Sequence, residues 1–531
     1  MKSLLGQRAV GQRSKQKSPV SLNGLGTKVY LPQAALHGVE YRPRNGSARR
    51  ESMPELTAPQ PRIIPLVYQP DSAHWFAAVR HLPNAIWLDS GHPGSHYGRF
   101  DIIAAAPQCL LETRGTNTSV HYCDGRIEAS AQDPFYLLKQ LLPIDQTTHS
   151  NSFPFVGGAL GYFGYDLGRR VETMPSLAQA DIGLPDMSVG IYPWAIVQDH
   201  AQQQSWLVIN EQLSQGLGGA YNFFEIEQLC AAQVKNPLFH DLKHYLKSSD
   251  KSFKISNFHS NLNVTEYRGA LAQIQEYIRA GDCYQVNFAQ RFSAEFSGDP
   301  FIAYLVLRDA LPSPFSGFME LDGGAVLSLS PERFIQVRGS EVETKPIKGT
   351  IKRGNTPEED AANAQWLQNS LKNRAENVMI VDLLRNDLSK HCANVRVPKL
   401  CELQTFANVH HLVSTVTGEL KANASAIDVL RDAFPGGSIT GAPKIRAMEI
   451  IEELEPTRRS LYCGSLGYIS ADGQMDTSIA IRTLVCDGKK IHCWGGGGVI
   501  ADSETDQEYR ESIAKVHLLM DTLEREFGNG I

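Results

Sequence analysis

Apolar residues recur along this chain at two spacings, one typical of helices and the other of strands. Over residues 264–280, Tyr267, Leu271, Ile274 and Ile278 fall on one helical face. The same spacing predicts helices over residues 71–79, 358–386 (as one or two helices), 441–454 and 507–527. Short apolar runs predict strands over residues 63–67, 85–88, 326–337, 342–351, 468–481 and 490–500, and tightly packed strand or turn structure over the Gly/aromatic run 156–165. Strands and helices mixed in this order predict an α+β fold.

The chain divides into four regions by composition. Residues 1–50 hold ten Lys or Arg and a single acidic residue, Glu40, so residues 1–60 are interpreted as a disordered basic extension; an organelle targeting peptide or a start placed too far upstream are the alternatives. Residues 61–240 are predicted to form an N-terminal lobe and residues 263–527 a catalytic region. The polar stretch 241–262 is predicted to connect them.

Composition excludes several classes of protein. Among 531 residues, 51 are basic and 57 acidic, which gives a net charge of −6 and argues against nucleic-acid binding. The nine cysteines form no CxxC pair, which argues against a zinc site and predicts reduced thiols in a cytoplasmic protein. No apolar run is long enough to predict a membrane span.

Two residues are candidates for acid–base or nucleophilic chemistry. On an extended strand, Lys348 shares a face with Val342, Thr344 and Pro346, and an amine held against apolar surface is more nucleophilic. Glu332 lies sixteen residues earlier and could act as a general acid if burial raises its pKa. The alternatives are a strand-end lysine that reaches solvent and a surface ion pair.

Three carboxylates are candidates for metal binding. Glu376 lies on the apolar stripe of its predicted helix and therefore needs a partner. In the last helix, Glu508 and Glu511 are three residues apart and Lys515 follows one turn later. A hard cation such as Mg²⁺ would offset the repulsion between these carboxylates; the alternative is a solvated, salt-bridged helix face.

A glycine run and an arginine are candidates for anion binding. The four glycines from Gly495 to Gly498 allow a close approach of the backbone to a ligand, with N–H groups free to hold an anion; a tight packing bend is the alternative. Arg482 follows apolar residues and suits a carboxylate.

Six collinear runs resemble the chorismate-utilising enzyme family, which includes component I of anthranilate synthase and of aminodeoxychorismate synthase. The resemblance covers about residues 62–527 and rests on GDCYQVN (281–287), SLSPERF (328–334), PIKGT (346–350), RAENVMIVDLLRNDL (374–388), FPGGSITGAPKIRAMEII (434–451) and GGGVIADS (496–503). It implies large antiparallel sheets in a sandwich, helices on the outside and two intertwined lobes.

The resemblance also implies roles for single residues. Glu376, Glu511 and Glu508 match the acidic positions of the family's Mg²⁺ site, although Asn373 stands where some relatives carry an acid. The positions that match the family's substrate site, where chorismate binds, are Arg482, Tyr468, Gly497, Gly498, Lys515, Thr440, His411 and Gln285. The positions that align with a tryptophan pocket, or else line the core, are Ser90, Tyr97, Gly98, Arg99, Phe100, Pro314 and Phe315.

Two positions indicate the branch of the family. Anthranilate synthases carry Ala at the position of Lys348, whereas PIKGT resembles the aminodeoxychorismate synthases. Gln285 replaces the lysine with which isochorismate-forming relatives activate water, and this fits ammonia as the nucleophile. The implied reaction is attack of Lys348 at C2 of chorismate, departure of the C4 hydroxyl with a proton from Glu332, and addition of ammonia at C4.

The sequence contains no recognisable glutaminase segment, so the resemblance implies a separate glutamine amidotransferase subunit. A bound tryptophan is a further expectation. An anthranilate synthase component I and a non-catalytic subunit that binds a partner are the alternatives.

Overall fold

The computed structural model describes residues 60–95, 98–144, 153–217, 222–234, 252–406 and 409–528. Residues 58–531 belong to one compact unit. Residues 1–59 of the predicted basic extension and most of the predicted connection over residues 241–262 lie outside the described residues. The end of that connection does not stay irregular, because it forms strands at residues 253–255 and 259–260.

The larger of two sheets has thirteen strands among the described residues. In spatial order they are β1 (Arg62–Leu66), β10 (Gln204–Ile209), β9 (Trp194–Asp199), β3 (Phe100–Ala104), β2 (Ile86–Asp89), β14 (Phe315–Leu321), β15 (Gly324–Ser330), β24 (Thr483–Asp487), β25 (Lys490–Val499), β13 (Gln285–Gly298) and β11 (Phe253–Ile255), with β12 (His259–Ser260) and β21 (Gly441–Ala442) beside β13. Neighbouring strands are antiparallel.

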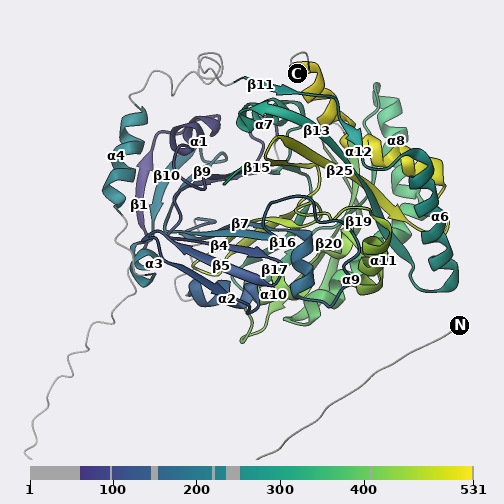
Figure 1. Ribbon diagram of the computed structural model, residues 1–531, viewed down its shortest axis with the longest axis horizontal. Coiled ribbons are helices and arrows are strands. Elements are labelled where there is room, and N and C mark those ends of the chain that lie inside the picture. The colour runs from purple at the N-terminus through teal and green to yellow at the C-terminus, as the bar shows by residue number, and fades with distance from the viewer. Residues whose placement is uncertain are drawn as a thin grey trace, which may run out of the picture. The chain divides into compact units, whose positions relative to one another are not determined.

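The second sheet has twelve strands in the described part of the chain. They are β18 (Ile347–Lys352), β20 (Val409–Leu420), β17 (Glu341–Thr344), β16 (Arg333–Arg338), β23 (Met475–Ile479), β22 (Ser465–Ser470), β7 (Gly158–Phe163), β8 (Met187–Tyr192), β4 (Cys109–Arg114), β5 (Asn117–Tyr122) and β6 (Ile127–Ser130), with β19 (Cys392–Thr405) beside β20. Figure 1 shows these strands below those of the first sheet, as two layers. The antiparallel α+β fold predicted from the sequence is thereby confirmed.

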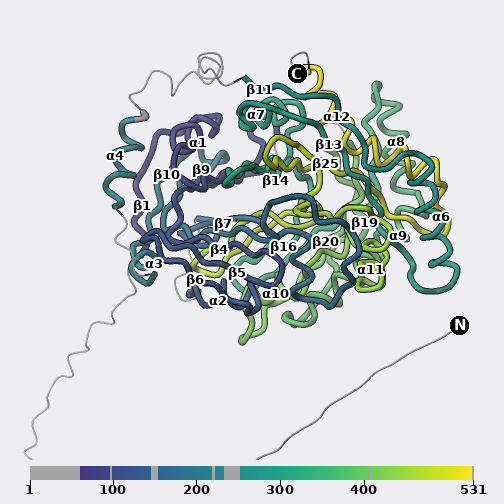
Figure 2. Tube along the Cα trace, in the orientation of Figure 1, coloured from purple at the N-terminus to yellow at the C-terminus, as the bar shows by residue number. Residues whose placement is uncertain are grey.

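Both sheets combine strands from the two halves of the chain. In the first sheet, β2 pairs with β14, and in the second, β7 pairs with β22. Neither half could complete its sheet alone, because each of these strands satisfies the backbone hydrogen bonds of its partner. The two lobes are therefore intertwined, as Figure 2 also shows by the mixing of early and late colours within each layer.

Helices cover the outer faces of the sheets and the connections between strands (Figure 1). They are α1 (Ala73–Val79), α2 (Pro134–Leu141), α3 (Glu211–Gly216), α4 (Phe223–Val234), α6 (Val264–Ala280), α7 (Pro300–Ala310), α8 (Pro357–Asn369), α9 (Leu371–Ser389), α10 (Ala426–Ala433), α11 (Lys444–Leu454) and α12 (Thr505–Phe527), with 3-10 turns at Tyr165–Arg170 and Gly437–Ile439. Helix α6 matches its predicted bounds because its ends carry strong signals: a capping box of Asn263 and Glu266, and Gly281 with φ 86°.

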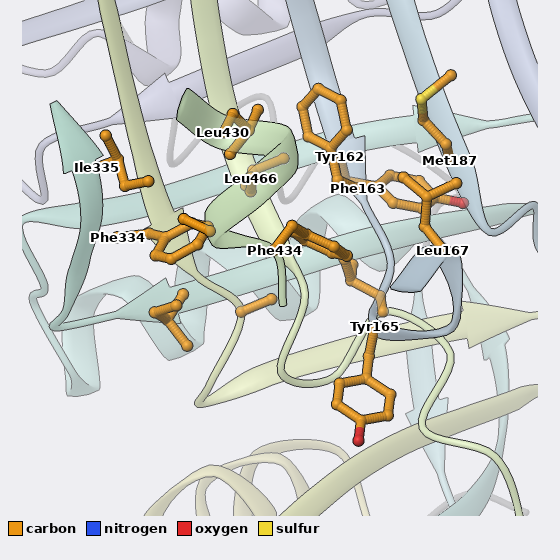
Figure 3. Close-up of a cluster of buried hydrophobic side chains, with 14 of the residues drawn as sticks. Tyr162, Phe163, Tyr165, Leu167, Met187, Phe334, Ile335, Leu430, Phe434 and Leu466 are labelled. Carbon is orange, nitrogen blue, oxygen red and sulfur yellow. The ribbon is translucent and has the colours of Figure 1, made fainter. Parts of the chain in front are cut away.

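A cluster of buried aromatic rings joins the two halves of the chain. In Figure 3, Phe163 of β7 lies in the same cluster as Phe434, which follows α10, and Phe334 of β16. Phe135 of α2 stacks on Phe163 at 5.4 Å, and Phe334 meets Phe434 edge-on at 6.5 Å. These rings fix the turn after Phe434 against the strand that follows Glu332.

Three predicted strands are interrupted. The run 326–337 breaks at Pro331, because proline has no N–H to donate to a ladder, and it becomes β15 in the first sheet and β16 in the second. The run 342–351 breaks before Pro346 into β17 and β18 for the same reason. The run 468–481 turns at Gly473 (φ 88°) between β22 and β23.

All nine cysteines lie in the described residues, and no two of them are bonded there. No helix in the described ranges is long and apolar enough to cross a membrane.

Candidate active site

Glu332 and Arg482 lie at two neighbouring points where the chain passes from one sheet to the other. Glu332 lies between β15 and β16, and Arg482 lies between β23 and β24. Backbone hydrogen bonds tie the two crossings together, since Ile479 N donates to Glu332 O at 3.0 Å and Leu329 N donates to Arg482 O at 3.0 Å. Residues far apart in sequence are thus held side by side by the sheets themselves.

Glu332 has the environment of a general acid. Its side chain is buried, with 5% exposed. Burial raises its pKa to about 7, against the opposing effects of a hydrogen bond from the Ser438 side chain and the nearby Lys348 ammonium. A carboxyl group with this pKa holds its proton through a large part of the neutral range and can give it up there.

Lys348 is a half-buried amine near several acids. Burial lowers its pKa, and nearby Lys515 adds to that effect, whereas Glu376, Glu332 and Glu511 oppose it. Among the described residues, no hydrogen bond or ion pair engages its Nζ. Val342, Thr344 and Pro346, which were predicted to share a face with Lys348, are all buried. The break before Pro346 interrupts the continuous strand on which that prediction relied.

His411 supports the strand that carries Lys348. It lies opposite Thr350 in the β18–β20 pair, and Thr350 Oγ1 is 2.7 Å from His411 Nδ1. Burial lowers the pKa of His411 to about 3, with a smaller effect from the Arg482 charge. His411 is therefore neutral at physiological pH, so it adds no positive charge beside Lys348.

The predicted carboxylates come together from helices α9 and α12. Burial raises the pKa of Glu376, and the charges of Glu508 and Glu511 raise it further against two nearby lysines. Lys515 lies 2.7 Å from Glu511 and lowers the pKa of that carboxyl. Glu508 is buried, accepts from Ser503 Oγ at 2.7 Å and lies 3.5 Å from the Nζ of Lys372.

Within the described ranges, no three His, Cys, Asp or Glu side chains converge closely enough to hold a metal ion by themselves. Glu511 and Glu508 are instead paired with Lys515 and Lys372, at 2.7 Å and 3.5 Å.

The glycine run serves two purposes. Gly495 lets α12 pack on β25, because a Cβ there would lie 1.9 Å from Ser512 O. Gly497 faces the acidic side chains of α12, since a Cβ there would lie 3.1 Å from Glu508 Oε2 and 3.5 Å from Lys515 Nζ. Strand β24 pairs with β25 only as far as Cys493, so the edge of the glycines opposite β13 has no strand partner among the described residues.

Arg482 is an enclosed cation beside that open edge. Its φ is 50°, and burial lowers its pKa. Its guanidinium has no hydrogen bond or ion pair in the described part of the chain. A guanidinium placed in this way offers its donors to an anion that is not part of the chain.

Thr440 and Gln285 are two further residues predicted for the substrate site. Gln285 begins β13, and Thr440 lies beside that strand. Thr440 is fully buried and its hydroxyl donates to Gly436 O at 3.1 Å. Gln285 lies opposite Ala442 in the pair formed by β13 and β21. Two residues that the sequence interpretation missed lie among them: Ser438, which contacts Glu332, and Asn287, which contacts Gln285. Both stand inside the quoted family motifs, which is the only signal that could have singled them out.

A cavity of about 260 Å³, separate from these residues, lies between strands of the two sheets. Its lining includes Ser90, Gly98, Arg99, Phe100, Pro314 and Phe315, six of the seven residues expected to form the tryptophan pocket. The seventh, Tyr97, lies outside the described residues.

The assignment of Tyr468 to the substrate site is wrong. Its ring lines the cavity between the sheets together with Leu466, and its hydroxyl accepts a hydrogen bond from Arg338 Nη2 at 3.0 Å. Leu466 and Tyr468 alternate with Gly467 on β22, so they share the face that the cavity occupies. The sequence pattern alone did not say which face of the strand the site would use.

Comparison with known proteins gives one family. A family model described as chorismate binding enzyme matches residues 83–521. Aminodeoxychorismate synthase component 1 of Escherichia coli (strain K12) is 46% identical over 470 residues, covering 88% of this chain and 99% of that protein. Anthranilate synthase component 1 of Aquifex aeolicus (strain VF5) is 34% identical, covering 83% and 90%.

A solved structure agrees with the fold. Anthranilate synthase component I from Streptococcus pneumoniae TIGR4 superimposes with a TM-score of 0.69 at 32% identity, covering 80% of this chain and 92% of that one. The resemblance inferred from the six motifs is thereby confirmed. On this evidence the chain belongs to the family of chorismate binding enzymes.

Proposed function

We propose that this protein is component 1 of an aminodeoxychorismate synthase, which converts chorismate and ammonia to 4-amino-4-deoxychorismate, a precursor of 4-aminobenzoate and folate. One observation carries the proposal: Lys348, an amine whose pKa burial lowers and whose Nζ has no partner among the described residues, lies near Glu332, a carboxyl with a pKa of about 7. The relatives with 44–46% identity over most of the chain carry the name aminodeoxychorismate synthase component 1.

Lys348 and Glu332 divide the first displacement between them. The Lys348 amine forms a bond to ring carbon C2 as the ring double bonds shift, and the C4–O bond breaks. Glu332 gives its proton to that oxygen, which leaves as water, so the carboxylate is then ionised. The Lys348 nitrogen keeps its two hydrogens, so the intermediate carries a positively charged secondary ammonium at C2.

The second displacement reverses the sequence at the ring. Ammonia forms a bond to C4, the double bonds shift back and the C2–N bond to Lys348 breaks. Lys348 leaves as a neutral amine with its two hydrogens, and the surplus proton on the new C4 ammonium is available to restore Glu332. The enolpyruvyl ether is not touched, so no pyruvate is released.

Arg482 and the open edge of the glycine run would hold a carboxylate of the substrate. The guanidinium supplies a planar pair of donors, and Gly497 and Gly498 place no side chain in the way. Lys515, which donates to Gly496 O at 2.9 Å, holds its ammonium against the same backbone.

The acidic residues fit a Mg²⁺ ion. Mg²⁺ in enzymes is commonly held by one or two carboxylates, with waters and the substrate completing the shell. Glu376 and Glu511 provide two carboxylates whose charges interact across two helices, and Glu508 lies beside them. When bound, the ion would neutralise these charges and hold a carboxylate of the substrate.

Replacing Glu376 by Gln should raise the Mg²⁺ concentration for half-maximal activity by at least about tenfold, equivalent to about 1.4 kcal/mol of binding free energy. Titrations of Mg²⁺ into chelator-treated enzyme at saturating chorismate measure this. Asp382→Asn on the same helix is the control, because Asp382 is exposed and its one ion pair among the described residues is with Arg385. An unchanged Mg²⁺ requirement in Glu376→Gln would remove Glu376 from the metal site.

The proposal also includes a partner that supplies ammonia and an occupant for the cavity between the sheets. The relatives are named as component 1, which supports a separate glutamine amidotransferase subunit that supplies ammonia. The cavity lined by Ser90, Arg99 and Phe100 combines apolar side chains with charged ones, which supports an amino acid such as tryptophan as its occupant. A cytoplasmic location also remains a prediction.

The purified chain with chorismate, Mg²⁺ and an ammonium salt should form 4-amino-4-deoxychorismate without pyruvate, measured by liquid chromatography with mass detection and a coupled pyruvate assay. Equal amounts of anthranilate and pyruvate would instead identify the alternative anthranilate synthase. No conversion of chorismate would favour the non-catalytic subunit.

A further inference from the structure

Strand β13 carries two amide side chains on one face at the end nearest the site. Gln285 and Asn287 are two residues apart, so they project from the same face, whereas Val286 between them is buried in the core. Gln285 Nε2 donates to Asn287 Oδ1 at 3.1 Å. Gln285 is fully buried, with 0% of its surface exposed.

A backbone carbonyl fixes the orientation of both amides. Asn287 Nδ2 lies 2.8 Å from Ser438 O, which can only accept a hydrogen bond, so this end of the Asn287 amide must be its NH₂ group. The other end is therefore an oxygen, and it accepts from the NH₂ group of Gln285. The carbonyl oxygen of Gln285 must then point away from Asn287.

That carbonyl oxygen is buried without a partner. Gln285 Oε1 has no hydrogen-bond donor among the described residues. A buried polar atom in this state is unfavourable, and most such atoms in folded proteins are satisfied. A small molecule with an N–H or O–H group, bound beside Gln285, would supply the missing donor.

The surroundings keep the amide pair in place. Gly498 lies opposite Asn287, and a Cβ there would come within 2.4 Å of Gln285 Nε2 and 2.9 Å of Asn287 Oδ1. The backbone of Asn287 is held on both sides, since its N–H donates to Thr440 O at 2.8 Å and its carbonyl accepts from Arg459 Nη2 at 2.6 Å. Asn287 therefore has little freedom to turn.

We propose that Asn287 is a positioning residue, which holds the Gln285 amide so that its carbonyl oxygen accepts an N–H from the incoming ammonia. This inference rests on the proposed function. An amide oxygen accepts a hydrogen bond but is too weak a base to take the proton, so the lone pair of ammonia stays free to add at C4. A flipped amide would present its NH₂ group and would bind that lone pair instead.

Ser438 connects this arrangement to the general acid. Its carbonyl accepts from Asn287, while its side chain bonds the carboxyl of Glu332. One short turn therefore positions both the group that protonates the leaving oxygen and the group that receives ammonia.

The test is steady-state kinetics with chorismate, Mg²⁺ and varied ammonium chloride at one pH. Asn287→Leu should raise the KM for ammonia by about 10-fold to 100-fold, the range expected for one misplaced hydrogen bond, and leave the KM for chorismate within about twofold. Asn287→Asp, which keeps an acceptor for Gln285 Nε2, should bind ammonia more tightly than Asn287→Leu.

Asn210→Leu is the matched control. Asn210 also donates from Nδ2 to a backbone carbonyl (Val156, 3.0 Å) and accepts at Oδ1 from a backbone N–H (Leu213, 3.0 Å), but it caps α3. It should lower the Tm with both KM values unchanged.

Equal rises of both KM values in Asn287→Leu, or an ammonia KM within twofold of wild type, would overturn the role of Asn287. If Asn287→Leu does not fold, an Asn287→Asp enzyme with an ammonia KM raised more than tenfold would also overturn it. Wild-type enzyme that forms no aminated product would instead refute the proposed function.

Discussion

Replacing Lys348 by Ala should lower kcat/KM for formation of the aminated product by about 10³-fold, equivalent to about 4 kcal/mol of transition-state free energy. The loss follows because, among the described residues, the other lysines beside these acids are paired: Lys515 with Glu511 at 2.7 Å and Lys372 with Glu508 at 3.5 Å. Product formation by mass detection measures the effect.

Lys348→Arg separates a nucleophile from a simple positive charge. Arginine keeps the charge but remains protonated and does not act as a nucleophile, so this variant should be as inactive as Lys348→Ala. Lys345→Ala is the matched control, because Lys345 lies three residues away, is partly exposed and pairs with Glu343 at 2.9 Å. A Lys348→Arg enzyme with near wild-type activity would refute nucleophilic catalysis by Lys348.

Replacing Glu332 by Gln should lower kcat by about 10²-fold to 10⁴-fold, the usual contribution of a positioned general acid. Gln has the same shape and can still accept from the Ile347 N–H, so the loss reports the proton and not the packing. Glu341→Gln, at an exposed position on β17, is the control. Activity retained within a few fold would assign the proton to another group.

The activity of the wild-type enzyme should depend on pH through the titration of Glu332. The pKa of Glu332 is raised from its ordinary value to about 7, and the acid must be protonated to act. The wild-type kcat/KM should therefore fall as pH rises through about 7. That descending limb should be missing from the residual activity of Glu332→Gln, measured over the same pH range, and its persistence there would contradict the assignment.

The helices could be predicted from sequence more closely than the strands. Helix α6 follows its prediction from Val264 to Ala280 because period, cap and stop are all local. The run 326–337 looks continuous in sequence, but its two parts belong to different sheets. Sheet membership depends on partners far along the chain, which no local pattern contains.

In the candidate site, too, the residues with a local signal could be predicted, and those placed by distant contacts could not. Lys348, Glu332 and Glu376 could be named because their residue types carry chemistry and their motifs resemble a known family. Asn287 and Ser438 could not, because the bond between them joins a side chain to a backbone carbonyl 151 positions away. Tyr468 was misplaced because its motif gave no information on the face of β22.

The most direct test of the central claim is the mass of the peptide containing Lys348 during turnover. Enzyme with chorismate and Mg²⁺, rapidly quenched with acid before and after ammonium is added, should carry on Lys348 the mass of chorismate less one water, and ammonium should discharge it. Enzyme that aminates chorismate while this peptide stays unmodified at every time point would contradict the account.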